Sequence, residues 1–309
     1  MRNVKKDFIS TQDIGLEDIE SIFLLTDKLK SAPDDYKTAL KANTLALIFQ
    51  KPSNRTRVSF EVGMTQLGGH SIYLGPDDIK LGVREAAKDV ASVLSRYVNG
   101  IVARTFSHLD IVELARYAAV PVINGLSDLL HPCQAMADIY TIKEKLGRLK
   151  GVRLAVVGDG NNVLHSLLHC ASKVGMDISA ATPKNYEPEK EISRQARVNA
   201  EKSGGRLSLG NDPARAVKGA DVIYTDVWTS MGQEKERKKR LKAFRKFQVN
   251  KGLLGLAKKT CIVMHCLPAH RGEEITDEVL DGPSSVVIDQ AENRLHVQKA
   301  ILIKLLTRC

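Results

Sequence analysis

The sequence of 309 residues is poor in aromatic side chains and has no long apolar run. Phe, Tyr and Trp together make up 5% of the residues, with a single Trp. No apolar run approaches the roughly 18 residues of a membrane-spanning helix, so we expect no membrane partner. Residues 1–10 contain no apolar block, and acidic residues follow soon afterwards. The sequence therefore predicts neither a secretory signal nor a transit peptide, and we expect a cytoplasmic protein.

Cysteine is also scarce, and its spacing excludes a disulfide framework. The five cysteines, an odd number with no CxxC pair, are Cys133, Cys170, Cys261, Cys266 and Cys309. This pattern is typical of reduced thiols in an intracellular protein. Zinc ligation would need histidines such as His265 and His270 beside Cys266, but their spacing matches no compact zinc motif. We therefore expect no metal.

The positive charge is concentrated in one segment. The net charge is +10, and residues 234–246 carry eight Lys or Arg against two Glu. The simplest interpretation is a mobile, solvent-exposed helix or loop, and the alternative is a patch for nucleic acid or a membrane surface. Only Phe244 and Phe247 would be available for base stacking, and no nucleic-acid fold motif accompanies them. We expect no nucleic-acid partner.

Strands alternate with helices along the chain, which predicts an α/β fold with mostly parallel sheets flanked by helices. The length favours two domains, with a boundary near residues 147–151. In the first part we expect strands at 43–49, 71–74, 100–104 and 120–124 and helices at 55–67, 85–95, 110–117 and 132–146. In the second part we expect strands at 153–157, 177–181, 221–227, 261–265 and 286–289 and helices at 162–174, 187–203 and 293–306.

The carboxyl ends of parallel strands meet at one edge of a sheet, where sites form. After the first strand the chain reads KPSNRTR, with Ser53 in the place of a helix N-cap and Arg55 and Arg57 in the first turn. Free backbone N–H groups, hydroxyls and guanidinium groups at a helix start suit a phosphate. The structural alternative is a capped helix with surface arginines. The motif GxxxxGK[ST] of P-loops is absent.

Four further motifs each have a structural alternative when considered singly. His131 and Gln134 of HPCQ suit binding of a carbonyl group and an amino group, and the structural alternative is a core histidine whose hydrogen bonds are satisfied. In GDGNN the third glycine of the dinucleotide motif is replaced by Val163, and Asn162 is either a carboxylate ligand or a helix cap. DVWTSMG suits an amino acid, or forms a plain turn. Cys266 of HCLPAHR would need a base to act as a nucleophile.

Together, SNRTR, ARTF, HPCQ, GDGNN, DVWTSMG, HCLP and AENR have the order and spacing of the carbamoyltransferase family, which the chain resembles over nearly its whole length. HCLP and DxWxSMG resemble the ornithine carbamoyltransferases within it. The resemblance implies a carbamoyl phosphate-binding domain (1–148, completed by the C-terminal helix 290–309) and an ornithine-binding domain (149–289), joined by the helix at 132–146. It also implies a homotrimer or an assembly of trimers with sites at subunit interfaces, and no cofactor.

The resemblance further implies a reaction of carbamoyl phosphate with L-ornithine and assigns residues to it. Catalytic roles would fall to Arg104, His131, Asp226 and Cys266. Carbamoyl phosphate would be bound by Ser53, Asn54, Arg55, Thr56, Lys80, Arg104, His131, Gln134, Cys266, Leu267 and Arg294. Ornithine would be bound by Asn162, Asp226, Ser230 and Met231, and the basic segment 234–246 stands where the family has a loop that closes on ornithine.

Two positions depart from the family pattern. Asn54 stands where Thr is most common, and the backbone N–H there can still serve. Lys80 stands where ornithine enzymes often carry Gln or His that reaches into the neighbouring subunit's site, and a lysine would bind phosphate as a point charge. The alternatives left open are another amine acceptor, such as putrescine or an acylated ornithine, and nucleic-acid binding through residues 234–246.

Overall fold

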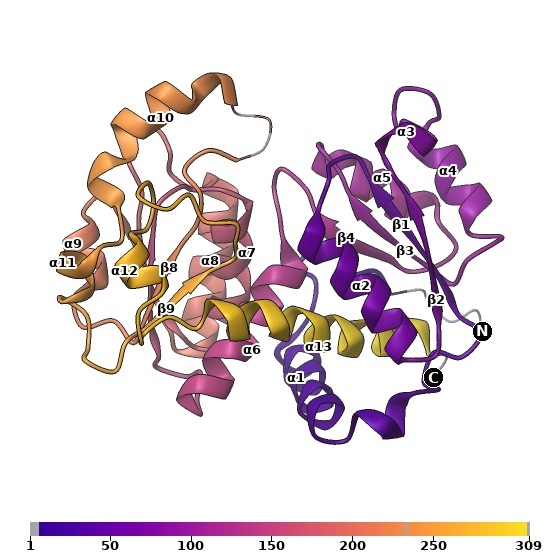
Figure 1. The fold of residues 1–309 in the computed structure, drawn as a ribbon, viewed down its shortest axis with the longest axis horizontal. Coiled ribbons are helices and arrows are strands. Elements are labelled where there is room, and N and C mark those ends of the chain that lie inside the picture. Colours follow the sequence, from indigo (N-terminus) through magenta and orange to yellow (C-terminus); the bar gives the residue numbers. More distant parts are fainter. Residues whose placement is uncertain (1–5, 231, 233, 308–309) are drawn as a thin grey trace. The chain divides into compact units, whose positions relative to one another are not determined.

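The computed structural model describes residues 6–230, 232 and 234–307, and the chain divides into two compact units (Figure 1). Unit 1 comprises Met1–Ala137 and Glu292–Cys309, and unit 2 comprises Asp138–Ala291. The division lies within helix α6 (Pro132–Leu146), whereas the sequence placed a boundary after this helix, at 148/149. Asp138 already belongs to unit 2, because its carboxylate accepts hydrogen bonds there from Tyr224 and Gln290.

Unit 1 contains a four-stranded parallel sheet in the order β2-β1-β3-β4. Its strands are β1 (Thr44–Phe49), β2 (His70–Leu74), β3 (Gly100–Arg104) and β4 (Val122–Leu126). Its helices include α1 (Leu16–Ser31), α2 (Asn54–Gln66), α3 (Pro76–Ile79), α4 (Ala87–Leu94) and α5 (His108–Tyr117), with a 3-10 turn η1 (Pro33–Tyr36). The central strands β1 and β3 are buried almost throughout, as expected for parallel strands covered on both faces.

Unit 2 contains a five-stranded parallel sheet in the order β7-β6-β5-β8-β9. Its strands are β5 (Arg153–Val157), β6 (Asp177–Ala181), β7 (Arg206–Gly210), β8 (Val222–Thr225) and β9 (Ile262–His265). Its helices include α7 (Asn162–Lys173), α8 (Lys190–Ser203), α9 (Pro213–Val217), α10 (Arg237–Phe244), α11 (Lys251–Leu254) and α12 (Asp277–Leu280), with 3-10 turns η2 (Glu234–Glu236) and η3 (Arg245–Phe247). The predicted α/β class with parallel sheets is confirmed.

The predicted strand at 286–289 is wrong, because these residues begin helix α13 (Val287–Leu306). The run VVID has β-branched residues that favour a strand locally, but Gln290 N donates to Val286 O at 2.9 Å in helical register. From Glu292 onward α13 belongs to unit 1, so the C-terminal helix packs back on that unit as expected. Among the described helices, none is both long and apolar enough to cross a membrane.

Candidate active site

The N-terminus of α2 lies directly after β1, and its first turn is organised by Ser53. The Ser53 backbone is extended, and its hydroxyl accepts a hydrogen bond from Thr56 N at 3.2 Å. Arg57 pairs with Glu61 at 2.9 Å and lies over the ring of Tyr73, 3.7 Å from its centroid. Arg57 therefore contacts Glu61 and Tyr73 on the surface of the helix. The first-turn N–H groups and the positive end of the helix dipole suit an anion.

Arg294 of α13 links two of the predicted site segments in unit 1. Its Nη1 donates to Gln134 Oε1 at 2.7 Å, and its Nη2 donates to Thr56 Oγ1 at 2.9 Å. All three side chains are buried. Hydrogen bonds from a charged donor are stronger than those between neutral groups, so this arrangement fixes the start of α2 relative to α6.

His131 lies just before α6 and is only 5% exposed. Burial holds its pKa well below the usual 6.5, and the guanidinium groups of Arg294, Arg104 and Arg55 lower the pKa further. The imidazole is therefore neutral at physiological pH and sits in a positive field. Arg104 is buried at the end of β3, beside Phe49 of β1. Such a group can bind a dianion and donate hydrogen bonds to an oxygen on which negative charge develops.

Lys80 is one of the predicted carbamoyl phosphate ligands in unit 1. It is exposed and follows α3 in a left-handed backbone conformation with φ of 52°. Within the described residues of unit 1, no hydrogen bond or ion pair joins Lys80 to Arg55, Arg104 or His131. Its predicted role, in the site of a neighbouring subunit, stays a prediction.

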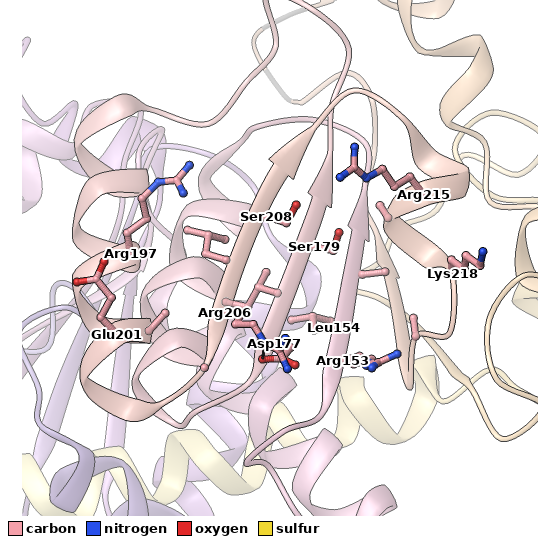
Figure 2. A pocket seen from close by; sticks show the side chains of 17 residues that line it. Arg153, Leu154, Asp177, Ser179, Arg197, Glu201, Arg206, Ser208, Arg215 and Lys218 are labelled. Carbon is pink, nitrogen blue, oxygen red and sulfur yellow. Dashed lines mark ion pairs between the residues drawn. The ribbon is translucent and has the colours of Figure 1, made fainter.

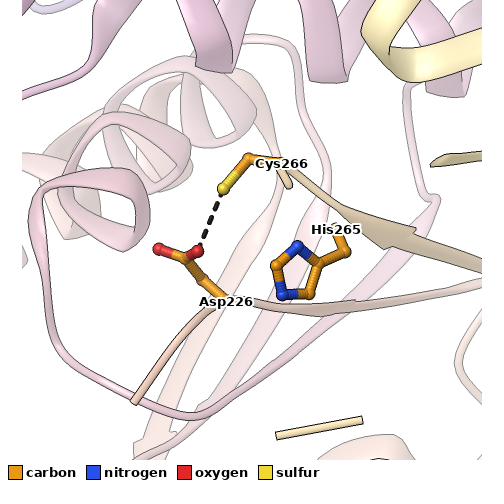
Figure 3. Close-up of side chains that lie close together, drawn as sticks. All are labelled: Asp226, His265 and Cys266. Atoms are coloured by element: carbon orange, nitrogen blue, oxygen red, sulfur yellow. Dashed lines mark hydrogen bonds between the residues drawn. The ribbon is translucent and has the colours of Figure 1, made fainter. Parts of the chain in front are cut away.

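In unit 2, Asp226 and Cys266 follow the carboxyl ends of the paired strands β8 and β9. The Cys266 thiol donates to Asp226 Oδ1 at 3.0 Å, as Figure 3 shows. Asn161 Nδ2 donates to the other oxygen, Asp226 Oδ2, at 2.7 Å. The carboxylate is thus oriented by two donors from two other segments. A half-buried carboxylate at a strand edge suits an ammonium group.

Asn161 contacts Asp226 and was not singled out from the sequence, which drew attention to Asn162 instead. Its side-chain oxygen caps α7 by accepting from Val163 N at 3.0 Å and Leu164 N at 3.1 Å, which directs its amide nitrogen to Asp226. Asparagine is a preferred N-cap residue, and this preference was the sequence signal that could have identified Asn161 as the cap. Of the other predicted ornithine ligands, Asn162 and Ser230 are both half-buried, and Met231 lies outside the described residues.

The HCLP turn after β9 is held by a buried pair, His265 and Glu274. His265 Nε2 lies 3.1 Å from Glu274 Oε1, and His265 Nδ1 accepts from Leu267 N at 2.8 Å. His265 N donates to Gln290 Oε1 at 2.9 Å. The backbone of Cys266 and Leu267 is therefore held by the hydrogen bonds of His265 N and Leu267 N.

Asp226, His265 and Cys266 offer possible metal-ligand atoms within 4.8 Å of one another. Both ring nitrogens of His265 already have partners, Glu274 and the backbone of Leu267. A metal ion here would have to displace one of these hydrogen bonds. The donor set therefore fits the turn better than it fits an ion.

The basic segment 234–246 is more than a solvated face, because Arg240 and Phe244 of α10 are buried. Arg240 Nη1 donates to Asp159 Oδ2 at 2.8 Å and to Trp228 O at 2.9 Å. These bonds tie α10 to the GDGNN turn and to the loop after β8. Phe244 and Phe247 are both buried, so neither presents a ring for base stacking, and the nucleic-acid alternative loses its aromatic platform.

We expect Arg240→Gln to destabilise the protein by about 3 kcal/mol at pH 8 and by less at pH 5, because it leaves a buried carboxylate unpaired. Burial raises the pKa of Asp159 from 3.8 to about 6, against the opposing effect of Arg240. This carboxyl group's contribution to the free energy of unfolding therefore falls as pH rises from about 4 through about 6. Below its pKa of about 6, Asp159 is mostly protonated and neutral. Loss of the Arg240 guanidinium then leaves no unpaired buried charge, so the substitution destabilises the protein less at pH 5.

Urea denaturation of Arg240→Gln at both pH values measures this difference. Arg237→Gln, on the same helix, is the matched control, because Arg237 is exposed and its ion pair with Glu273 contributes at most about 1 kcal/mol. Equal losses for Arg240→Gln at pH 5 and pH 8 would contradict a buried ion pair.

Comparison with known proteins places both units in one family. The family model "Aspartate/ornithine carbamoyltransferase, carbamoyl-P binding domain" matches residues 6–144, and "Aspartate/ornithine carbamoyltransferase, Asp/Orn binding domain" matches residues 150–305. A protein named "Ornithine carbamoyltransferase, anabolic" from Pyrococcus furiosus is 56% identical over 299 residues, covering 96% of this chain and 95% of the relative.

Solved structures of carbamoyltransferases have the same fold as this chain. The ornithine carbamoyltransferase from Pyrococcus furiosus superimposes with a TM-score of 0.95 at 54% identity, covering 98% of this chain and 97% of that chain. An acetylornithine transcarbamylase complexed with acetylcitrulline gives a TM-score of 0.89 at 32% identity, covering 98% of this chain and 100% of that chain. The two family models span nearly the whole sequence, and the chain belongs to the aspartate/ornithine carbamoyltransferase family.

Proposed function

We propose that the protein transfers the carbamoyl group of carbamoyl phosphate to the δ-amine of L-ornithine, giving L-citrulline and phosphate. The observation that carries this proposal is the buried His131 with Arg55 and Arg104, all in the part of the chain matched by the carbamoyl phosphate-binding model, and with Arg294 of α13. The relatives named as ornithine carbamoyltransferases support ornithine as the acceptor.

The phosphate is bound by the start of α2 together with Arg104. Ser53, Asn54, Arg55 and Thr56 contribute backbone N–H groups, hydroxyls and one guanidinium at the positive end of the helix. Lys80 acts from a neighbouring subunit, in a homotrimer or an assembly of trimers with sites at subunit interfaces. The exposed position of Lys80 in the single chain supports this arrangement.

The carbonyl carbon becomes tetrahedral as the amine attacks, and its oxygen gains negative charge. Arg104, His131 and Thr56 donate to that oxygen, which lowers the barrier because the donors are already in place. Gln134, Arg294 and the backbone carbonyls of Cys266 and Leu267 orient the carbamoyl amino group. The hydrogen bonds of Arg294 to Gln134 and Thr56 support its assignment as a positioning group.

Ornithine is bound by Asn162, Asp226, Ser230 and Met231, with Asn161 orienting the carboxylate of Asp226. An alkyl ammonium has a pKa of about 10, so the δ-amine must lose one proton before it attacks. Asp226 and Cys266 place the amine and assist that loss. The new N–C bond then forms, the C–O bond to phosphate breaks, and the departing phosphate takes the second amine proton.

We also propose a cytoplasmic location. The four cysteines among the described residues, Cys133, Cys170, Cys261 and Cys266, are free thiols. Free thiols persist in a reducing compartment.

Replacing Cys266 with alanine is expected to lower kcat/KM for ornithine about tenfold and to leave carbamoyl phosphate binding unchanged. The substitution removes the S–H donor that orients Asp226 Oδ1, a loss of the order expected for one hydrogen bond to a charged group. Cys261→Ala is the control, because Cys261 is buried at the start of β9 and affects packing. Unchanged turnover with ornithine across the pH range would remove Cys266 from the mechanism.

The test of the proposed function is citrulline formation by the purified protein from carbamoyl phosphate and L-ornithine. Aspartate, putrescine and N-acetylornithine are assayed in parallel, the last because an acetylornithine transcarbamylase has the same fold. Activity with ornithine alone supports the proposal. Activity with another amine instead would overturn the assignment of Asp226 and Ser230 to ornithine, and phosphate release with no amine would overturn the transfer itself.

A further inference from the structure

Unit 2 contains a groove of about 590 Å³ on its sheet that no part of the proposed reaction uses. The groove lies over strands β5, β6 and β7 and is bordered by α8 and α9 (Figure 2). Its charged lining residues are Arg153, Asp177, Arg197, Glu201, Arg206, Arg215 and Lys218. A volume of this size is in the range of small-molecule sites.

Strand register explains the composition of the groove floor. Asp177 of β6 pairs with Arg153 of β5 and with Arg206 of β7, which gives a charged row at the amino ends of the strands. Two residues along, Ser179 pairs with Ala155 and with Ser208, which gives a row of small and hydroxyl side chains. Alternate residues of a strand share a face, so both rows lie on one side of the sheet.

This end of the sheet is opposite to the candidate active site. Asp226 and Cys266 follow the carboxyl ends of β8 and β9, whereas the charged row of the groove is formed at the amino ends of β5, β6 and β7. A molecule in the groove would therefore not touch the residues assigned to ornithine.

Helix cover over this part of the sheet is thin. Parallel sheets are normally covered by helices on both faces. Here α9, which packs against β5 and β6, has five residues. Ser208 of the edge strand β7 is exposed, and Ser179 is half-buried. The floor of the groove therefore remains open to a ligand.

The groove has an excess of positive charge. Five lining residues are basic and two are acidic. Arg206 Nε lies 3.5 Å from Asp177 Oδ1, which partly neutralises one of them. Among the described residues, Arg197, Arg215 and Lys218 form no ion pair, and all three are exposed. Figure 2 shows Arg197 on one side of the two serines and Arg215 with Lys218 on the other.

We propose that this groove binds a small anion carrying two or more phosphate groups. Guanidinium forks match phosphate oxygens, and the hydroxyls of Ser179 and Ser208 add donors on the floor between them. Because the unpaired cations stand on both sides of the floor, a ligand with several phosphates engages more of them than a single phosphate does. This proposal does not depend on the proposed function.

The test is calorimetric titration with inorganic tripolyphosphate. The Arg55→Gly variant, in which the phosphate site assigned to α2 is weakened, is compared with the same variant carrying the further substitutions Arg197→Gln and Arg215→Gln. Orthophosphate is titrated in parallel. Arg96→Gln/Arg116→Gln is the matched control, because it removes the same charge from exposed positions of unit 1.

We expect tripolyphosphate affinity to fall at least tenfold in the groove variant and less than twofold in the control, with orthophosphate at least tenfold weaker than tripolyphosphate. Equal losses in both double variants would indicate general charge attraction and overturn the site. An unchanged tripolyphosphate affinity in the groove variant would also overturn the site. A change of sedimenting mass in the groove variant, without a change in tripolyphosphate binding, would instead assign the face to a second copy of the chain.

Discussion

Arg55→Gly is expected to reduce kcat/KM for carbamoyl phosphate by about a thousandfold, or about 4 kcal/mol of transition-state stabilisation. Arg55 lies in the first turn of α2, and its guanidinium is one of the three that lower the pKa of His131. Its removal takes away the proposed charge-assisted contact to phosphate and part of the positive charge around His131. Both effects act on the same substrate, which is why this loss is the largest expected.

The matched control is Arg57→Gly, the same substitution two residues later in the same helix turn. Arg57 pairs with Glu61 and lies over the ring of Tyr73, so its loss is expected to lower stability slightly and to leave carbamoyl phosphate affinity near its original value. Equilibrium binding of carbamoyl phosphate and steady-state kinetics measure both variants. Normal affinity in Arg55→Gly, or the same loss in Arg57→Gly, would show that the phosphate site is elsewhere.

Asp226→Asn is expected to reduce kcat/KM for ornithine by about a hundredfold while carbamoyl phosphate still binds. The amide keeps the shape of the carboxylate but loses its charge, and one of its two polar atoms becomes a donor. Asn161 Nδ2 and the Cys266 thiol both donate to this group, so the amide cannot satisfy both donors. The proposed acceptor for the substrate ammonium and the geometry of the loop are then lost together.

Asp221→Asn is the corresponding control at the other end of β8. Asp221 is buried and accepts hydrogen bonds from Lys258 Nζ at 2.6 Å and Arg153 N at 2.9 Å. These bonds stabilise the start of β8, whereas Asp226 follows its carboxyl end. We expect this variant to lose stability and to keep its KM for ornithine. Separate kinetic constants for the two substrates distinguish these outcomes. An Asp226→Asn enzyme with an unaltered KM and kcat for ornithine would exclude Asp226 from the acceptor site.

Local patterns predicted eight of the nine described strands, with β4 and β8 each ending two residues from the predicted position, but not which of two similar neighbouring residues makes a given contact. Ser53 and Thr56 could be assigned to a helix start because capping is a property of a few consecutive residues. Arg55 and Arg57, by contrast, carry the same side chain in the same turn, and only Glu61 and Tyr73 distinguish them. The edge strand β7 was missed because RLSLG lacks the continuous apolar run of a central strand.

The sequence by itself determined the parallel α/β class, the alternation of strands and helices and the family, because each depends on short-range periodicity or on ordered motifs. Only the tertiary structure decided the charge state of His131, since its pKa depends on burial and on arginines from three distant segments. It alone also showed that Arg240 is buried against Asp159 and that the β6–β7 face is open. These properties depend on which segments meet in space, and a linear pattern does not carry that information.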